Sequence, residues 1–246
     1  MITPDRTALL VMGAIFLATI IRSTFGFGEA LVSVPLLALV VPVEIAAPVA
    51  VLASITIALI AVVQDWRHIH LRSASWLVLS TLAGIPLGLW LLKAVPESIV
   101  KGGLAVVIAA FSTYSMVSKH KSELKNEKLS WIFGFAAGIM GGAYGMNGPP
   151  LVIYGSLRKW SPQHFRATLQ GYFLPASLVG MFGYWVAGLW TASVTRLYLL
   201  ALPAIVVATF LGRVINRSMN AMQFLFYVHA GLILIGCALL WQSIPK

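Results

Sequence analysis

The chain has 246 residues, of which 59% are hydrophobic and only 10% are charged. This composition excludes a soluble enzyme and a receptor with a large extramembrane domain, because no polar stretch is long enough to fold around a separate aqueous core. The formal net charge of +10 lies in the loops and lacks the interleaved aromatic residues of a single-strand binder, so nucleic acid is not expected as a partner.

Ten apolar segments are predicted to be helices in a lipid bilayer. A segment of about twenty residues crosses the roughly 30 Å hydrocarbon core at 1.5 Å per residue, whereas the shorter segments would reach only roughly 15–22 Å. In chain order these are two short segments at 8–22 and 29–41, long segments at 43–64, 73–92 and 98–117, short segments at 130–143 and 149–158, and long segments at 167–188, 194–214 and 222–243.

A glycine-rich break joins each pair of short segments. The first break is Arg-Ser-Thr-Phe-Gly-Phe-Gly-Glu at 22–29, and the second is Gly-Gly-Ala-Tyr-Gly-Met-Asn-Gly-Pro-Pro at 141–150. The breaks align when Gly26 is placed against Gly145. After one inserted residue, Gly28 then meets Gly148.

This register continues into the following segments, so we interpret the chain as an internal duplication within one integral membrane domain. One repeat covers 8–117, a cytoplasmic linker covers 118–129, and the second repeat covers 130–243. The predicted fold is an all-α polytopic transmembrane bundle of two inverted repeats. Each repeat has a broken, re-entrant helix pair and three spanning helices.

The distribution of basic residues predicts the orientation. The loops at 65–72, 118–129, 158–166 and 213–220 hold eleven Lys and Arg residues, against five on the other side. Because cytoplasmic loops carry an excess of Lys and Arg, both termini are predicted to lie outside. Five crossings per repeat would give the same count, so whether the short segments cross or re-enter stays open.

Irregular backbone at membrane depth is tolerated only inside protein or beside water, so a duplicated break indicates a functional site. The helices that begin near Glu29 and after Gly148 would point their positive N-terminal ends inward, where an anion can bind. The glycines, among them Gly26 and Gly28, allow a ligand to approach bare backbone.

Three neighbouring polar residues enter the first break. Arg22 supplies a fixed charge, and Ser23 and Thr24 supply hydroxyl donors, a combination suited to an oxyanion such as sulfite, a sulfonate or a carboxylate. The alternative is that Arg22 extends to a membrane interface. Glu29 could carry a proton coupled to substrate movement, or it could pair with Arg22 and hold the hairpin closed.

Asn147 is the polar counterpart in the second break, able to donate to an anion, although asparagine is also a frequent turn former. Tyr154, Gln170 and Tyr172 flank this break. They could line a cavity, or they could serve as hydrogen-bond partners between helices. His229 has no second ligand at metal spacing and is interpreted as an interior histidine.

No catalytic motif, metal site or phosphate-binding loop is present, so neither an enzyme nor a cofactor is expected. The single cysteine, Cys237, excludes an intrachain disulfide. The expected partners are a small anionic substrate and the lipid bilayer. Protons are a candidate coupling ion, and a homodimer is left open.

Both breaks resemble the sulfite exporter TauE/SafE permease family. The matching motifs are Gly26-Phe-Gly-Glu-Ala-Leu-Val-Ser-Val-Pro-Leu-Leu37 and Gly138-x-x-Gly141-Gly-x-x-Gly145-x-x-Gly148-Pro-Pro-Leu151, the second followed by Phe-Arg-Ala-Thr at 165–168. The resemblance covers nearly the whole chain. It implies a secondary transporter that moves sulfite, sulfoacetate or a related sulfonate across the bacterial inner membrane.

We therefore predict export of a small oxyanion by alternating access. The central site would combine Arg22, Ser23, Gly26 and Gly28 with Asn147 and Gly148, and Glu29 would be the coupling group. An importer of the same anions remains an alternative, as does a membrane-embedded anion sensor or assembly subunit that does not transport. The duplicated break favours a transporter, because a sensor needs only one copy.

Overall fold

The computed structural model of the chain describes residues 4–65, 71–117, 124, 129–216 and 221–243. These residues form ten α-helices and no β-strand, which confirms the predicted all-α fold. In chain order the helices are α1 (Pro4–Phe25), α2 (Glu29–Ala38), α3 (Val43–Asp65), α4 (Leu71–Ala94), α5 (Glu97–Val117), α6 (Ser130–Tyr144), α7 (Gly148–Leu157), α8 (Pro162–Val186), α9 (Ala192–Asn216) and α10 (Ala221–Ser243).

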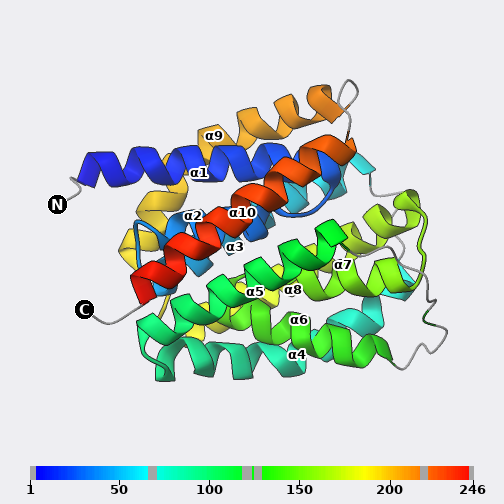
Figure 1. Cartoon of the computed structure of the whole chain (residues 1–246), viewed down its shortest axis with the longest axis horizontal. Helices are drawn as coiled ribbons and strands as arrows, with labels where there is room; N and C mark the ends of the chain where they lie inside the picture. Colours follow the sequence, from blue (N-terminus) through cyan, green and yellow to red (C-terminus); the bar gives the residue numbers. More distant parts are fainter. Residues whose placement is uncertain (1–3, 66–70, 118–123, 125–128, 217–220, 244–246) are drawn as a thin grey trace.

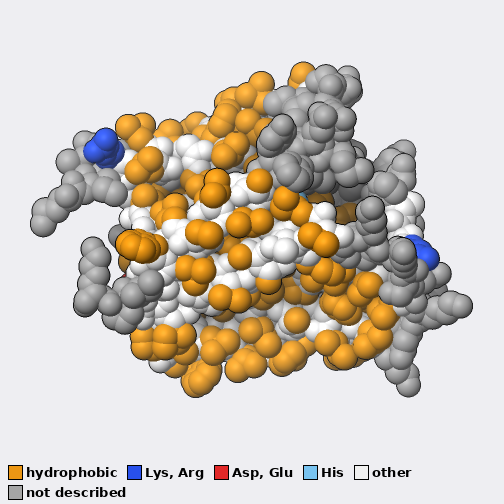
Figure 2. All heavy atoms as spheres, viewed as in Figure 1, with side chains coloured by type: hydrophobic (Ala, Val, Ile, Leu, Met, Phe, Trp, Pro, Cys, Tyr) orange, Lys and Arg blue, Asp and Glu red, His pale blue; other side chains and the backbone are white. Residues whose placement is uncertain are grey.

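Within the described residues, five helices are long and apolar enough to cross a membrane, in agreement with a polytopic membrane bundle. Their spans are Arg6–Thr24, Val43–Ile60, Ser75–Ala94, Glu97–Val117 and Ala192–Gly212. The predicted crossing segments 167–188 and 222–243 correspond to α8, which ends at Val186, and to α10, and neither helix is among these five spans. Hydrophobic side chains cover much of the visible surface, and the visible Lys and Arg side chains lie at its two ends (Figure 2), as contact with lipid requires.

Helix α1 is longer than the short segment predicted at 8–22. It has 22 residues and is one of the five candidate spans, so this prediction was wrong for the first pair. The helix continues past Arg22 to Phe25, and within this stretch the hydroxyl of Thr24 donates to the carbonyl oxygen of Ile20 at 2.8 Å. The second pair is shorter, with 15 residues in α6 and 10 in α7.

The ten helices repeat one order of elements, because α1 to α5 and α6 to α10 both consist of a helix, a ten-residue helix and three long helices. The most extensive helix–helix contacts each join a helix of one unit to a helix of the other. The first helix of each unit packs against the fourth helix of the other, α1 on α9 and α6 on α4, and α5 packs against α10. In Figure 1 these first-to-fourth pairs lie on opposite sides of the molecule.

The two units run in opposite directions. In Figure 1, α1 leads away from the end that holds both termini, and α6 leads back toward that end. An exchanged contact pattern with reversed direction is what a two-fold axis across the helices produces, the arrangement of inverted-repeat transporters.

In both breaks, a glycine with a positive φ follows the first helix. Gly26 has φ 83° and Gly145 has φ 66°, a left-handed conformation in which a helix can end and a residue with a β-carbon is strained. The N–H of Gly26 donates to the carbonyl oxygen of Arg22, which closes the last turn of α1. The second helix begins three residues later in each break, at Glu29 and at Gly148. No inserted residue separates the breaks, so Gly28 corresponds to Asn147 rather than to Gly148 as predicted.

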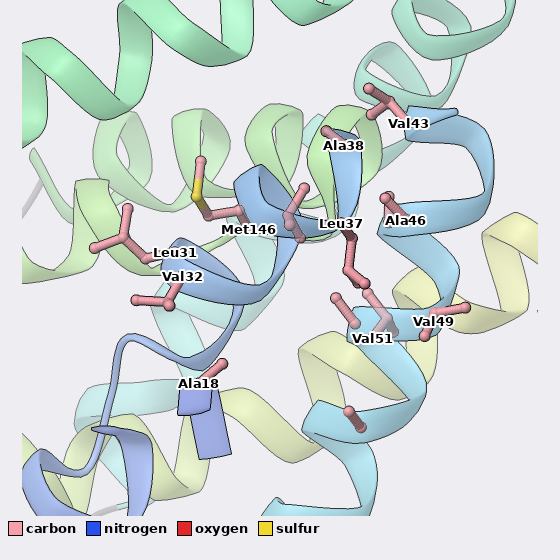
Figure 3. Packing of buried hydrophobic residues seen from close by; sticks show 14 of the residues in the cluster. Ala18, Leu31, Val32, Leu37, Ala38, Val43, Ala46, Val49, Val51 and Met146 are labelled. Carbon is pink, nitrogen blue, oxygen red and sulfur yellow. The ribbon is translucent and has the colours of Figure 1, made fainter. Parts of the chain in front are cut away.

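The larger hydrophobic core surrounds the short helix α2. Leu31, Val32 and Leu37 of α2 belong to one buried cluster with residues of α3 and with Met146 of the second break, and Leu37 lies on the side of α2 that faces α3 (Figure 3). A ten-residue helix is marginal in isolation, so burial of its apolar side chains is what holds α2 in place. The core therefore positions the N-terminal end of α2, where the first break opens.

Candidate functional site

One pocket lies between the two breaks, and it is lined by residues of both. Its cavity volume is about 20 Å³, which corresponds to about one water. Its lining comprises Arg22, Phe27, Gly28, Glu29, Ala30 and Leu31 of the first break and α2, Ser54 of α3, Phe111 of α5, Gly145, Asn147, Gly148, Pro149 and Val152 of the second break and α7, and Phe173 of α8.

Arg22 reaches this pocket from the last turn of α1. Its side chain is buried, so the alternative in which it extends to a membrane interface does not describe this structure. Its Nη1 donates to the hydroxyl of Ser54, and its guanidinium carbon lies 4.8 Å from the ring centroid of Phe173. A guanidinium held by a hydroxyl and an aromatic face keeps its charge at a fixed place inside the bundle.

Glu29 is the first residue of α2 and is the counter-charge of Arg22. Its Oε2 lies 3.5 Å from Nη1 of Arg22, and its Oε1 accepts a hydrogen bond from Ser33 at 3.2 Å. Glu29 Oε2 accepts no hydrogen bond from the described residues. The pairing that the sequence left as one alternative is therefore present, and it ties the end of α1 to the start of α2.

Asn147 directly precedes α7 and belongs to a chain of polar contacts. Its Nδ2 donates to the hydroxyl oxygen of Tyr172 at 3.2 Å, and that hydroxyl lies 2.7 Å from Oγ1 of Thr81. Thr81 in turn donates to the carbonyl oxygen of Gly134 at 2.9 Å. These bonds fix the second break against α8, α4 and α6.

The start of α7 offers fewer backbone donors than a typical helix N-terminus. Pro149 and Pro150 occupy its first turn and carry no N–H, so the donors nearest the pocket are the N–H of Gly148 and the side-chain amide of Asn147. The macrodipole of α7 still places its positive end at the pocket. Much of the positive character of the site therefore comes from Arg22.

Three predicted site residues contact other parts of the bundle. The hydroxyl of Thr24 donates to the carbonyl oxygen of Gly212 in α9 at 3.1 Å, and the β-carbon of Ser23 faces the same glycine. Tyr154 packs its ring against Trp160, with centroids 5.4 Å apart. None of the three lines the pocket. Consecutive helical residues point about 100° apart, so Ser23 and Thr24 cannot face the pocket together with Arg22.

Gly26 and Gln170 were also predicted to be site residues. Gly26 ends α1 but is not among the pocket-lining residues, so its contribution is conformational. The side chain of Gln170 lies outside the described residues, and its predicted role stays a prediction.

Sequence reasoning missed Ser54, Phe111 and Phe173 as lining residues. Ser54 carried a weak signal, because it is a polar residue within an apolar segment. The two phenylalanines carried none, since phenylalanine is common throughout such segments. Each of the three lies on a long helix far from both breaks in the sequence.

The chain is similar to a known protein family. A family model described as "Sulfite exporter TauE/SafE" matches residues 11–239, which is nearly the whole chain. No curated protein and no solved structure matches.

Proposed function

The chain belongs to the sulfite exporter TauE/SafE family, and from this premise we propose that it is a secondary transporter that carries a small oxyanion through the pocket between its two breaks. The proposed substrates are sulfite, sulfoacetate and related sulfonates. The proposed direction is export across the inner membrane, with both termini outside the cytoplasm.

The observation that carries this proposal is the meeting of both breaks at one buried cation. Arg22 supplies the charge, and the positive ends of α2 and α7 approach the same pocket from the two units. A planar guanidinium offers paired donors that match two oxygens of a carboxylate, a sulfonate or a sulfite. An anion sensor would need no second, oppositely directed break at the site.

The size of the pocket and the packing of each unit against the other support alternating access as the proposed mechanism. Room for about one water is too small for an oxyanion, so substrate binding requires the pocket walls to move. Because α1 packs on α9 and α6 on α4, each of these pairs joins one unit to the other. We propose that such pairs move as bodies, opening the pocket first to one side and then to the other.

The proposal is tested with purified protein in detergent and in lipid vesicles. Sulfite, sulfoacetate, sulfate, acetate and taurine are compared by thermal shift, and labelled sulfoacetate is followed in counterflow. A true ligand at about a hundred times its Kd stabilises the folded state by about 2.7 kcal/mol, so the melting temperature should rise clearly with sulfite or sulfoacetate. Taurine is the control, because its ammonium group cancels its net charge.

Absence of both stabilisation and counterflow for every anion of the panel would contradict the proposed function. Counterflow of acetate alone would support a transporter, but its substrates would then be carboxylates and not sulfite or sulfonates. Vesicles in which the protein faces one known way then decide between export and the alternative of import.

A further inference from the structure

The pocket already holds an anion, the carboxylate of Glu29. This carboxylate lies 3.5 Å from the guanidinium of Arg22, where an oxyanion would have to bind to use the same donors. Among the described lining residues, Arg22 and Glu29 are the charged side chains, so the pocket carries no net side-chain charge while both are ionised. A substrate anion brought beside an ionised Glu29 would meet a like charge in a space with room for about one water.

We propose that Glu29 is a tethered competitor of the substrate, which must take up one proton and release Arg22 before an oxyanion can bind. Each anion is then carried together with one proton. This inference rests on the proposed function, since it concerns the same pocket.

The proton step changes one bond. A hydronium ion that reaches the pocket breaks one of its O–H bonds and becomes water, its proton forms an O–H bond on the carboxylate of Glu29, and the substrate anion replaces the carboxylate at Arg22. Ser33 lies one turn further along α2, 3.2 Å from Oε1, and its hydroxyl oxygen can accept a hydrogen bond from the protonated carboxyl group. Departure of the anion on the other side lets Glu29 lose the proton and pair with Arg22 again.

Few other side chains around Glu29 could take up this proton. The lining side chains from the other helices do not gain or lose a proton near neutral pH. They are Ser54 of α3, Phe111 of α5, Asn147 before α7 and Phe173 of α8. Helix α10 also contacts α2, and its His229 is buried. Its ring lies 5.7 Å from that of Phe111, behind the pocket wall, and it is therefore included as a control.

Joint binding determines how the membrane potential acts on transport. A singly charged sulfonate would move with its proton without net charge transfer. Doubly charged sulfite or sulfoacetate would carry one net negative charge outward, so an inside-negative potential would drive export while the outward proton opposes it.

Calorimetric titration with sulfoacetate tests the inference. This probe keeps its charge between about pH 6 and about pH 8, because unperturbed carboxyl groups titrate near pH 4. Titrations in two buffers with different heats of ionisation count the protons taken up on binding. Wild-type protein should take up one proton per anion, and its affinity should fall about tenfold per pH unit once Glu29 is ionised.

The variants separate Glu29 from other acids and from structural effects. Glu29→Gln should bind sulfoacetate without proton uptake and with the same affinity at both pH values. Glu44→Gln, which removes an exposed carboxylate at the start of α3, should behave like the wild type, and so should His229→Gln. If Glu29→Gln does not fold, Ser33→Ala replaces it. The bond from Ser33 to the ionised carboxylate is stronger than the bond it can make to the protonated group, so its loss should keep sulfoacetate bound to a higher pH.

Binding by the wild type without proton uptake would overturn the inference and leave the proposed function standing. An unchanged proton count in Glu29→Gln would overturn it as well, as would an unshifted pH profile in Ser33→Ala. Failure of the wild type to bind any oxyanion would remove the proposed function and this inference together.

Discussion

Replacement of Arg22 by alanine is expected to lower sulfoacetate transport in reconstituted vesicles by about tenfold or more. A hydrogen bond to a charged group contributes about 1.5–3 kcal/mol, and about 1.4 kcal/mol corresponds to a factor of ten in binding. Arg22 is the one cation among the described lining residues, so nothing else there can take its place. Arg6→Ala, at an exposed position near the start of α1, is the matched control and should transport normally.

The same substitution leaves Glu29 as a buried carboxylate without its partner, which typically costs 3–5 kcal/mol. A folding defect must therefore be separated from a binding defect. The double variant Arg22→Ala with Glu29→Gln removes both charges and should recover the thermal stability of the wild type without recovering transport. Normal uptake and affinity in the double variant would remove Arg22 from the substrate site.

The second large effect concerns the seam of glycines between α4 and α6, where Gly138 of α6 lies against Gly84 of α4. A β-carbon built on Gly138 would contact the carbonyl oxygen of Thr81 and would lie 2.9 Å from Cα of Gly84. Both are backbone atoms, which cannot turn away as a side chain can. Gly138→Ala should therefore separate the two helices and lower the melting temperature in detergent, with a cost of about 1–3 kcal/mol for overpacking.

Gly13→Ala in α1 is the control for this seam and should have the opposite sign. A β-carbon at Gly13 meets nothing within 4 Å, and alanine is favoured over glycine inside a helix by roughly 0.5–1 kcal/mol. Its melting temperature should equal or exceed that of the wild type. Equal stability of the two alanine variants would show that α4 and α6 do not pack backbone to backbone.

The predictable part of the fold followed from hydropathy and glycine spacing. Apolar length predicted the order of the helices, since each backbone group in lipid has to be bonded within its own helix. The glycines predicted where the short helices break, because Gly26 and Gly145 adopt a conformation that other residues rarely take. The alignment was one residue off, because Gly28 and Gly148 share a residue type but hold different positions relative to the following helix.

The site was predictable only in part. Arg22, Gly28, Glu29, Asn147 and Gly148 were expected from the breaks, and the structure brings all of them to one pocket. Ser23 and Thr24 were expected because they neighbour Arg22 in sequence, but helical phase turns them toward α9. The remaining wall comes from α3, α5 and α8, whose contacts depend on how distant helices pack, and a local pattern contains no information on that.

The meeting of the two breaks around one anion site is tested most directly by a crystal structure of the protein grown with selenite, a heavier analogue of sulfite. We expect a selenium anomalous peak within hydrogen-bond distance of the Arg22 guanidinium, between Gly28 and Asn147, with Glu29 turned away from Arg22. Selenite found only at surface loops, with the Arg22 and Glu29 pair intact at saturating concentration, would contradict it.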